Sequence, residues 1–486
     1  MKFLKSTLVI LGVLLCSCHK DLDIDQTSQL SATSMWTDEN DAISAMYGTH
    51  QLLRGTFNNG LMYWGEYRTG LWGPGNHGGL SQTVRDQAYQ NTMTNTHAYA
   101  DWENMYETIN MANLLLRYTP QITFSDQTEK DRVMANGYFV RAMCYYWIAR
   151  IWGDAPLVLE GYESASQDLL PTRTPVAAIL SQVEMDIEAG LNLMPSGTSD
   201  RNIASQGALQ MLMADYALWM YTTQNGGDTY LQMASNAVNQ VLGMGYQLES
   251  NYGNIFESAS ESGPEVIYAW NYEQDEYTGG YPVDFQFNSA TVSPVYHFNP
   301  VAVGTGQQWT FYTDDYVSVL TADPTDTRLT TNYLEFYDDL MGQEFHWTNK
   351  YKGSWVNNTL ILDSDIILYR LADAYFYKAE IEFYNGDMVG AVEAINAVVQ
   401  RAYGTPEHYT GTFSAPEVKE ILVSERMREF PAEGKLWWDF IRLEVIFDIN
   451  TYLTGREGSQ NILLWPLSDN SINDNPNLGG QTPGWE

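Results

Sequence analysis

Two amphipathic segments joined by a three-residue turn most constrain what this chain can fold into. The first reads IILYRLADAYFYKAEIEFY from Ile366, and its apolar residues recur at steps of three and four: Leu368, Leu371, Ala372, Tyr375, Ala379 and Phe383. After the turn NGD, a second apolar face is formed by Met388, Ala391, Val392, Ile395 and Val399. Helices joined by so short a turn pack antiparallel, and the alanines let their backbones approach closely. The segment therefore predicts an antiparallel helical pair.

Helical periodicity recurs along the chain and is interrupted by two irregular regions. It predicts helices at about 34–53, 99–118, 129–151, 175–194, 204–222 and 229–243. Segment 55–79 contains eight glycines and predicts a long loop, while residues 250–360 predict loops with a few short strands. We therefore expect a mainly α fold with a loop-rich irregular region, and the pair at 366–399 is similar to a tetratricopeptide repeat.

The N-terminus indicates export and lipid attachment. A positively charged start precedes an apolar run from Leu8 to Leu15, which is shorter than the roughly 20 residues needed to span a bilayer. The next motif, LCSC, resembles a bacterial lipobox, with Cys16 in place of the usual small residue. We expect lipid on Cys18 and three regions: a signal peptide at 1–17, a lipidated tether at 18–33 and a single domain at 34–486.

The acidic composition limits the partners of this chain. With 25 Lys and Arg against 60 Asp and Glu, the formal net charge is −35, so nucleic acid and anionic lipid are repelled. Three cysteines are too few for a disulfide framework, and we expect Cys144 to be a buried thiol. The seven histidines show no zinc-site spacing. We predict no metal site, no cofactor and no nucleic-acid partner.

The abundant carboxylates raise glycoside cleavage as an alternative, because that reaction needs two acidic groups about 5 to 9.5 Å apart. Glu425, Glu429 and Glu433 recur every four residues beside Arg426 and Arg428. This spacing is typical of an ion-paired helical face. No motif for an activated serine, a phosphate loop or a dinucleotide occurs in a suitable context. We predict that the chain is not an enzyme.

Five separated segments together resemble the SusD/RagB family in content and in order. They are Trp36-Thr37 with Tyr47, then Arg141-Ala142 with WGDAPL, then YRLADAYFYKAEIEFYNG with Arg401-Ala402, then the run from Glu425-Arg426 through Glu433-Gly434 to Arg442, and finally Trp465-Pro466-Leu467 with a closing PGW. Lys435 stands where the family usually has arginine. The motifs cover both ends and the middle of the chain.

This resemblance implies a mainly α lipoprotein in which tetratricopeptide-like helical pairs form a scaffold wrapped by a loop-rich irregular region. It also implies that the protein sits on a SusC-like TonB-dependent transporter and binds glycan, or in some members peptide, without catalysis. Acidic residues after Cys18 resemble the surface-export signal of Bacteroidota lipoproteins. We therefore expect a protein anchored by lipid at the extracellular face of the outer membrane, which captures a glycan or oligosaccharide for the transporter. A peptide-binding relative and a secreted glycoside hydrolase remain the alternatives.

Aromatic residues in the two irregular regions are the candidate glycan platform, because rings stack on the apolar faces of sugars while polar groups bind the hydroxyls. The predicted ligand-binding residues are Trp64, Tyr67, Arg68, Trp72, Asn76, Trp270, Tyr296 and Trp309, with His77, Asn299 and Gln308 as further hydrogen-bonding candidates. A patch of Arg68 and Arg85 would offset the negative charge locally. The alternative is that most of these rings pack the loops onto the helices. The sequence does not identify the ligand.

Overall fold

The structure, a computed structural model, does not describe every residue of the chain. It describes residues 35–75, 83–197, 200–258, 263–276, 278–297, 299–301, 303–304 and 306–485. The predicted signal peptide and the predicted tether, which begins at Cys18, lie outside the described residues. So does Ser34, the first residue of the first predicted helix. Asn76 and His77 of the predicted site also lie outside them.

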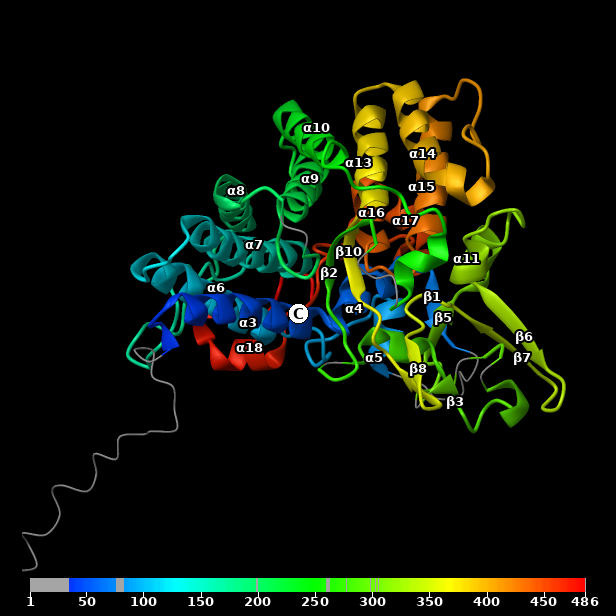
Figure 1. The fold of residues 1–486 in the computed structure, drawn as a ribbon, viewed down its shortest axis with the longest axis horizontal. Helices are drawn as coiled ribbons and strands as arrows, with labels where there is room; N and C mark the ends of the chain where they lie inside the picture. Colours follow the sequence, from blue (N-terminus) through cyan, green and yellow to red (C-terminus); the bar gives the residue numbers. More distant parts are fainter. Residues whose placement is uncertain are drawn as a thin grey trace, which may run out of the picture.

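Long helices form the N-terminal half, as their periodicity predicts. They are α3 (Glu39–Phe57), α6 (Glu103–Tyr118), α7 (Gln127–Trp152), α8 (Val176–Leu193), α9 (Gln206–Thr223) and α10 (Asp228–Leu242). Side-chain caps define several starts: Asp38 accepts the Asn40 amide hydrogen at 2.8 Å, and Asp126 accepts that of Thr128 at 2.8 Å. Helix α7 packs against α3, α6 and α8, and α9 packs against α10. Figure 1 shows these helices on one side of the molecule.

A second helical group contains the predicted antiparallel pair. Its members are α13 (Leu371–Tyr384), α14 (Met388–Tyr403), α15 (Ala415–Glu429) and α16 (Leu436–Arg442). Helix α14 begins after Asp387, whose side chain accepts the Gly390 amide hydrogen at 2.9 Å, and it ends at Gly404 in the left-handed conformation. Helix α13 packs on α14, and both contact α15. Because α10 packs against α13, the two helical groups form one scaffold (Figure 1), and the predicted mainly α fold is confirmed.

Short strands and turns form the rest of the described chain. The strands pair two by two: β1 (Trp72–Pro74) with β5 (Thr310–Tyr312), β2 (Val266–Trp270) with β10 (Ile366–Arg370), β3 (Phe287–Asn288) with β4 (Val303–Gly304), β6 (Leu334–Asp338) with β7 (Gln343–Trp347), and β8 (Ser354–Val356) with β9 (Thr359–Ile361). Only the β3–β4 pair among these is parallel. Region 250–360 is thus loop-rich with short strands, as expected, and the β6–β7 hairpin projects from the body in Figure 1.

Short helical turns connect these elements. The α-helical ones are α4 (Gly60–Gly65), α5 (Thr83–Tyr89), α11 (Asp314–Leu320), α12 (Leu329–Asn332), α17 (Ile446–Ile449) and α18 (Asp469–Asp474). The 3₁₀ turns are η1 (Tyr67–Thr69), η2 (Thr119–Gln121), η3 (Tyr252–Phe256), η4 (Tyr281–Phe285), η5 (Pro294–Tyr296), η6 (Thr451–Leu453) and η7 (Pro476–Leu478). Among the described helices, none is long and apolar enough to cross a membrane.

Two local predictions are wrong. Residues 366–370 form the strand β10 rather than the start of a helix, because this β-branched run is buried along its whole length against β2. Segment 55–79 is not simply a long loop, since its described part contains the end of α3, then α4, η1 and β1. All residues of α4 are buried.

Close backbone packing explains why this segment is rich in glycine. A Cβ atom on Gly65 would lie 1.9 Å from the carbonyl oxygen of Gly434. In the reverse direction, a Cβ atom on Gly434 would lie 2.4 Å from Cγ of Leu61, and Gly434 has a φ of +70°. The two glycines let α4 touch the turn that follows α15. The glycines therefore serve contact between segments far apart in sequence.

We predict that Gly65→Ala lowers the free energy of unfolding by about 3 kcal/mol, because the new methyl group cannot fit against the Gly434 carbonyl. The matched control is Gly55→Ala, at an exposed helical position where a Cβ atom meets nothing within 4 Å. That change should raise stability by about 0.5–1 kcal/mol, since alanine favours the helix. Urea unfolding of both variants tests this, and equal stability of the two would contradict the packing argument.

Candidate functional site

Five of the predicted ligand-binding residues have buried side chains. The exposed fractions are 3% for Trp64, 0% for Tyr67, 0% for Arg68, 1% for Trp72 and 2% for Trp270. Their rings pack on other rings: Trp64 lies edge-on to Phe57, Trp72 stacks on Phe285, and Trp270 stacks on Phe57. These contacts favour the alternative that the rings pack the irregular segments onto the helices. A ligand-binding role for these five residues stays a prediction, and their burial counts against direct contact.

Arg68 acts as a clamp between distant segments. Its guanidinium donates to the carbonyl oxygens of Leu463 at 2.9 Å and Ile462 at 2.8 Å and to Oδ1 of Asn91 at 2.8 Å, and it lies 4.1 Å from the ring centroid of Trp437. The expected positive patch of Arg68 and Arg85 is wrong, because Arg68 is fully buried and Arg85 is paired with a carboxylate.

Trp309 and Tyr296 remain half-buried in the described structure. Tyr296 hydrogen-bonds to the carboxylate of Asp339 and lies edge-on to Phe336, with ring centroids 4.6 Å apart. Asn299 is exposed, whereas Gln308 is buried and donates to the carbonyl oxygen of His346 at 2.5 Å. Trp309 is the better-supported platform, because three segments brace it.

The brace of Trp309 is an ion pair between Arg85 on α5 and Asp284 on η4. The Arg85 guanidinium donates two hydrogen bonds to Asp284, at 2.6 and 3.1 Å, and lies 5.7 Å from the centroid of the Trp309 ring. Tyr67 donates to the same carboxylate at 3.3 Å, and the Trp309 amide donates to the Asp284 carbonyl at 3.0 Å. Gly75 continues this contact, because its amide donates to the Trp309 carbonyl at 3.3 Å.

The electrostatics of this cluster suit an uncharged ligand. Burial raises the pKa of Asp284, and the positive charge of Arg85 partly opposes that rise. The pair is therefore neutral as a unit, and neither charge is available to an ionic ligand. What remains accessible is part of an indole ring held in a fixed orientation. Such a ring can stack on the apolar face of a sugar, while nearby polar groups bind its hydroxyls. Asp284 gave no signal as a site residue in the sequence, and the sequence grouped Arg85 with Arg68 rather than with Asp284, because the Arg85–Asp284 pairing spans 199 positions.

The three predicted ion-paired glutamates belong to a fully buried charge network. Its centre is Arg370, whose guanidinium lies 2.8 Å from Glu265, 2.6 Å from Glu429 and 2.9 Å from Glu433. Arg401 pairs with both Glu265 and Glu429. The predicted ion pairing is confirmed, although Glu433 lies in the turn beyond α15 rather than on its helical face.

The remaining members complete the neutralisation of this network. Arg328 lies 2.7 Å from Glu425 and 3.1 Å from Glu429, while Lys350 lies 2.7 Å from Glu433. Burial alone would raise the pKa of Glu429, but the charges of Arg401, Arg370 and Arg328 hold it far below its ordinary value. The same balance lowers the pKa of Glu433, where Arg370 and Lys350 contribute most. Both groups are enclosed and paired with cations that favour their ionised form, which suits an ion-pairing role rather than that of a proton donor for glycoside cleavage.

Glu66 is the exception among the carboxylates beside this network. It is fully buried, and one oxygen accepts the Glu433 amide hydrogen at 3.2 Å. Among the described residues, the other oxygen has no hydrogen-bond partner. Burial raises the pKa of Glu66 well above its ordinary value, and Lys350 opposes this only in part. The raised pKa favours the protonated form of Glu66 in the folded protein.

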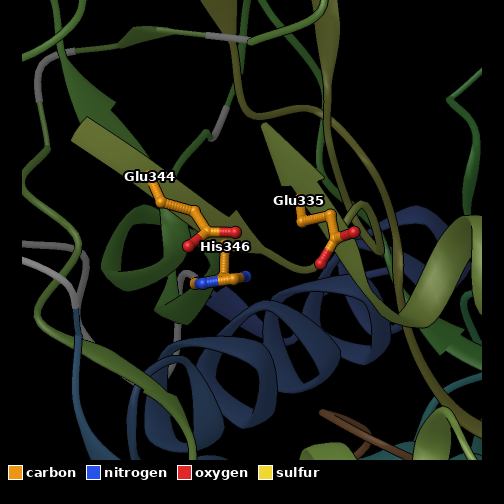
Figure 2. Close-up of side chains that lie close together, drawn as sticks. All are labelled: Glu335, Glu344 and His346. Carbon is orange, nitrogen blue, oxygen red and sulfur yellow. The ribbon is translucent and has the colours of Figure 1, made fainter. Parts of the chain in front are cut away.

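A cluster of potential metal ligands lies on one face of the β6–β7 hairpin (Figure 2). Glu335 pairs across the ribbon with His346, and Glu344 is two residues before His346 on the same strand. One ligand atom from each lies within 4.8 Å of the others. Tyr333 links two of them, with its hydroxyl 3.1 Å from Glu335 and 2.8 Å from Nδ1 of His346. These residues could hold a divalent cation, but the two glutamates are exposed and such groups also occur on surfaces without one. The expected absence of a metal site stays a prediction.

The chain belongs to the SusD family. The family model of that description matches residues 182–485, and a second model, described as starch-binding and associating with the outer membrane, matches residues 75–218. The two models overlap and together extend from the region of β1 to the end of the described chain. This confirms the resemblance carried by the sequence motifs.

One relative and one solved structure of this family match the chain over nearly its full length, and a second relative matches a shorter part of it. SusD-like protein P38 of Formosa agariphila is 26% identical over 98% of this chain and 97% of its own. The starch-binding protein SusD of Bacteroides thetaiotaomicron is 31% identical over 27% of this chain and 24% of its own. Among solved structures, B. fragilis NanU superimposes with a TM-score of 0.83 and 25% identity, covering 95% of this chain and 100% of that one. The helical scaffold is therefore that of the SusD superfamily.

We predict that Glu66→Gln stabilises the protein at pH 7.5 by roughly 1 kcal/mol or more, because the wild-type side chain must keep a proton that the unfolded chain releases. The unfolded glutamate ionises above about pH 4.5, so the wild-type protein loses stability as the pH rises through that value. The advantage of glutamine should therefore shrink toward zero at pH 4. Thermal unfolding at both pH values measures it.

The matched control for this prediction is Glu420→Gln, an exposed position on α15. It should leave the midpoint of thermal unfolding unchanged at both pH values. A Glu66→Gln protein that is less stable than the wild type at pH 7.5 would show that Glu66 is ionised and paired in the folded state.

Proposed function

We propose that this chain is a cell-surface lipoprotein that captures a glycan and delivers it to a TonB-dependent outer-membrane transporter, without cleaving it. The observation that carries the proposal is a half-buried indole, Trp309, braced by the Arg85–Asp284 pair on the scaffold of a family described as starch-binding. Partial exposure and a neutral brace are what stacking on a sugar face requires. The ionised, enclosed state of Glu429 and Glu433 supports capture without cleavage.

The location of the protein is part of the same proposal. A family description of association with the outer membrane agrees with a lipobox-like LCSC motif at Cys18. Acyl chains on that cysteine would contribute roughly 0.8 kcal/mol for each buried methylene, so an anchor of several chains is effectively permanent. The acidic residues of the tether favour the extracellular face, where a SusC-like transporter is the proposed partner.

We expect Trp309→Ala to weaken glycan binding about tenfold or more, because losing about 100 Å² of stacked apolar area removes up to roughly 2.5 kcal/mol. Isothermal titration calorimetry with starch, xylan, β-glucan and galactomannan oligosaccharides measures the change. The matched control is Trp355→Ala on β8, where the ring is 38% exposed. That variant should bind like the wild type.

Two outcomes of the same experiment would contradict the proposal. One is release of reducing sugars above the buffer control during prolonged incubation, which would mean that the protein is a hydrolase. The other is binding of a mixed peptide digest with no binding of any oligosaccharide, which would make it a peptide-binding member of the family. Unchanged sugar affinity in the Trp309→Ala variant would mean that this ring is not part of the binding site.

We predict that Cys18→Ala moves the protein from the membrane fraction to the soluble fraction of expressing cells, because the thiol that carries the lipid is lost. Cys16→Ala is the control, since it retains Cys18 and places a small residue two positions before it, where the lipobox usually has one. Fractionation and protease treatment of intact cells provide the measurement. Membrane retention of the Cys18→Ala protein would contradict lipid anchoring at this residue.

A further inference from the structure

Two cavities meet at the beginning of α6, and Trp309 lines neither of them. The first, of about 320 Å³, is lined by the end of α3, the start of α4 and residues 98–105. The second, of about 480 Å³, lies between α6, segment 156–171 and segment 471–478. Both are lined by Asp101 and Glu103, so they adjoin each other. None of the residues that brace Trp309 lines either cavity.

Aromatic rings form fixed walls in this groove. In the second cavity, Trp102 and Tyr106 lie edge to face with centroids 5.5 Å apart, and the Tyr106 hydroxyl donates to the Pro156 carbonyl at 2.7 Å. Tyr162 lines the opposite segment, with its backbone amide bonded to Oδ1 of Asn110 at 2.6 Å. In the first cavity, Tyr99 stacks on Tyr63 with centroids 3.9 Å apart. Ring faces held in this way lose little entropy on binding a ligand.

Polar side chains that line the groove have spare hydrogen-bonding capacity. Asn59 and Asn104 both line the first cavity, and among the described residues their side-chain amides have no hydrogen-bond partner. An amide offers two donors and two acceptor sites, which match the mixed donor and acceptor character of sugar hydroxyls. Fixed rings with amides beside them make the arrangement that binds both the faces and the edges of a pyranose.

The charge of the groove selects among ligands. Among the described residues, its lining includes Asp101, Glu103, Glu107 and Asp474 and no lysine or arginine. A uronate or sulfate group placed there would be repelled by these carboxylates. Neutral sugars meet no such penalty. The combined volume lies within the range of about 300–1,000 Å³ that is usual for small-ligand sites.

We propose that this groove is a second carbohydrate site, which takes neutral oligosaccharides and discriminates against anionic ones. The inference rests on the proposed glycan-binding function but uses different residues from the Trp309 cluster. A peptide is the less suitable occupant, because the groove lacks a free strand edge for backbone pairing. A basic peptide nevertheless matches the acidic rim, so it is included in the test.

The test uses calorimetry with maltohexaose, cellohexaose, xylohexaose and mannohexaose, and with hexagalacturonate as the anionic probe. Wild-type protein should bind a neutral hexasaccharide at two sites. Trp309→Ala and Tyr162→Ala should each lose one site, and the double variant should lose both, with at least a tenfold fall in affinity at each altered site. The matched control is Tyr452→Ala, an equivalent removal of a ring that is 49% exposed on η6, and it should retain both sites.

A second pair of variants tests the charge argument and guards against misfolding. Asn104→Ala, at an exposed helical position, should weaken the Tyr162-dependent site without altering the thermal midpoint, because alanine favours the helix. Glu107→Gln combined with Asp474→Asn should strengthen hexagalacturonate binding at least fivefold at low salt while leaving neutral sugars unaffected. The gain should fade at high salt, where exposed charges are screened.

The remaining outcomes separate this inference from the proposed function. If Trp309→Ala removes all sugar binding, the assignment of the groove as a sugar site is overturned and the proposed function stands. If binding depends on Tyr162 but not on Trp309, the groove stands and the Trp309 site is overturned. Binding of a lysine-rich peptide that depends on Tyr162, without sugar binding there, overturns the sugar assignment. A wild-type protein that binds no neutral hexasaccharide overturns both.

Discussion

The buried ion network around Arg370 is the interaction on which the arrangement of this molecule depends. It joins the β2–β10 pair, through Arg370 and Glu265, to the end of α15 and the turn beyond it, through Glu429 and Glu433. Lys350, which lies in the irregular region, pairs with Glu433 and so connects that region to the same network. Removing one partner of such a network leaves an unpaired buried charge, which typically costs 3–5 kcal/mol. The irregular region is therefore fixed to the helical scaffold by charge pairing, which tolerates little displacement.

A second constraint acts next to this network and ties the N-terminal segment to the C-terminal one. Gly65 lies against Gly434, so α4 touches the turn that carries Glu433. Arg68 then donates to carbonyl groups of residues 462–464, close to the end of the chain. The segment from Gly60 to Trp72 is thus enclosed by parts of the chain more than 350 residues away. Its aromatic rings hold the scaffold together, and the ligand contacts that we propose fall on other rings, those of Trp309 and of the groove.

The sequence predicts the helices well but does not show which of its aromatic residues are buried, for a physical reason. Helical periodicity is local, so α7, α9 and the α13–α14 pair are visible in short windows of sequence. The glycines of segment 55–79 suggest flexibility in the same windows, yet Gly65 serves a contact with Gly434 that no window contains. The burial of Tyr67 and Arg68 depends in the same way on Asp284 and Ile462. The Glu335–Glu344–His346 cluster requires the register of the β6–β7 hairpin, which the sequence does not reveal.

A protein that captures a ligand and then releases it needs a different binding free energy from an enzyme that encloses its substrate. A transporter can accept a ligand only if the surface protein releases it, so moderate affinity from a few stacked rings is more useful than tight enclosure. A ring face of about 100 Å² contributes up to roughly 2.5 kcal/mol before the costs of association. Two such contacts separated along one oligosaccharide would raise the overall affinity through effective concentration while each contact still exchanges rapidly. A surface that combines Trp309 with the aromatic groove beside α6 would therefore hold a long neutral glycan firmly and yet surrender it one segment at a time.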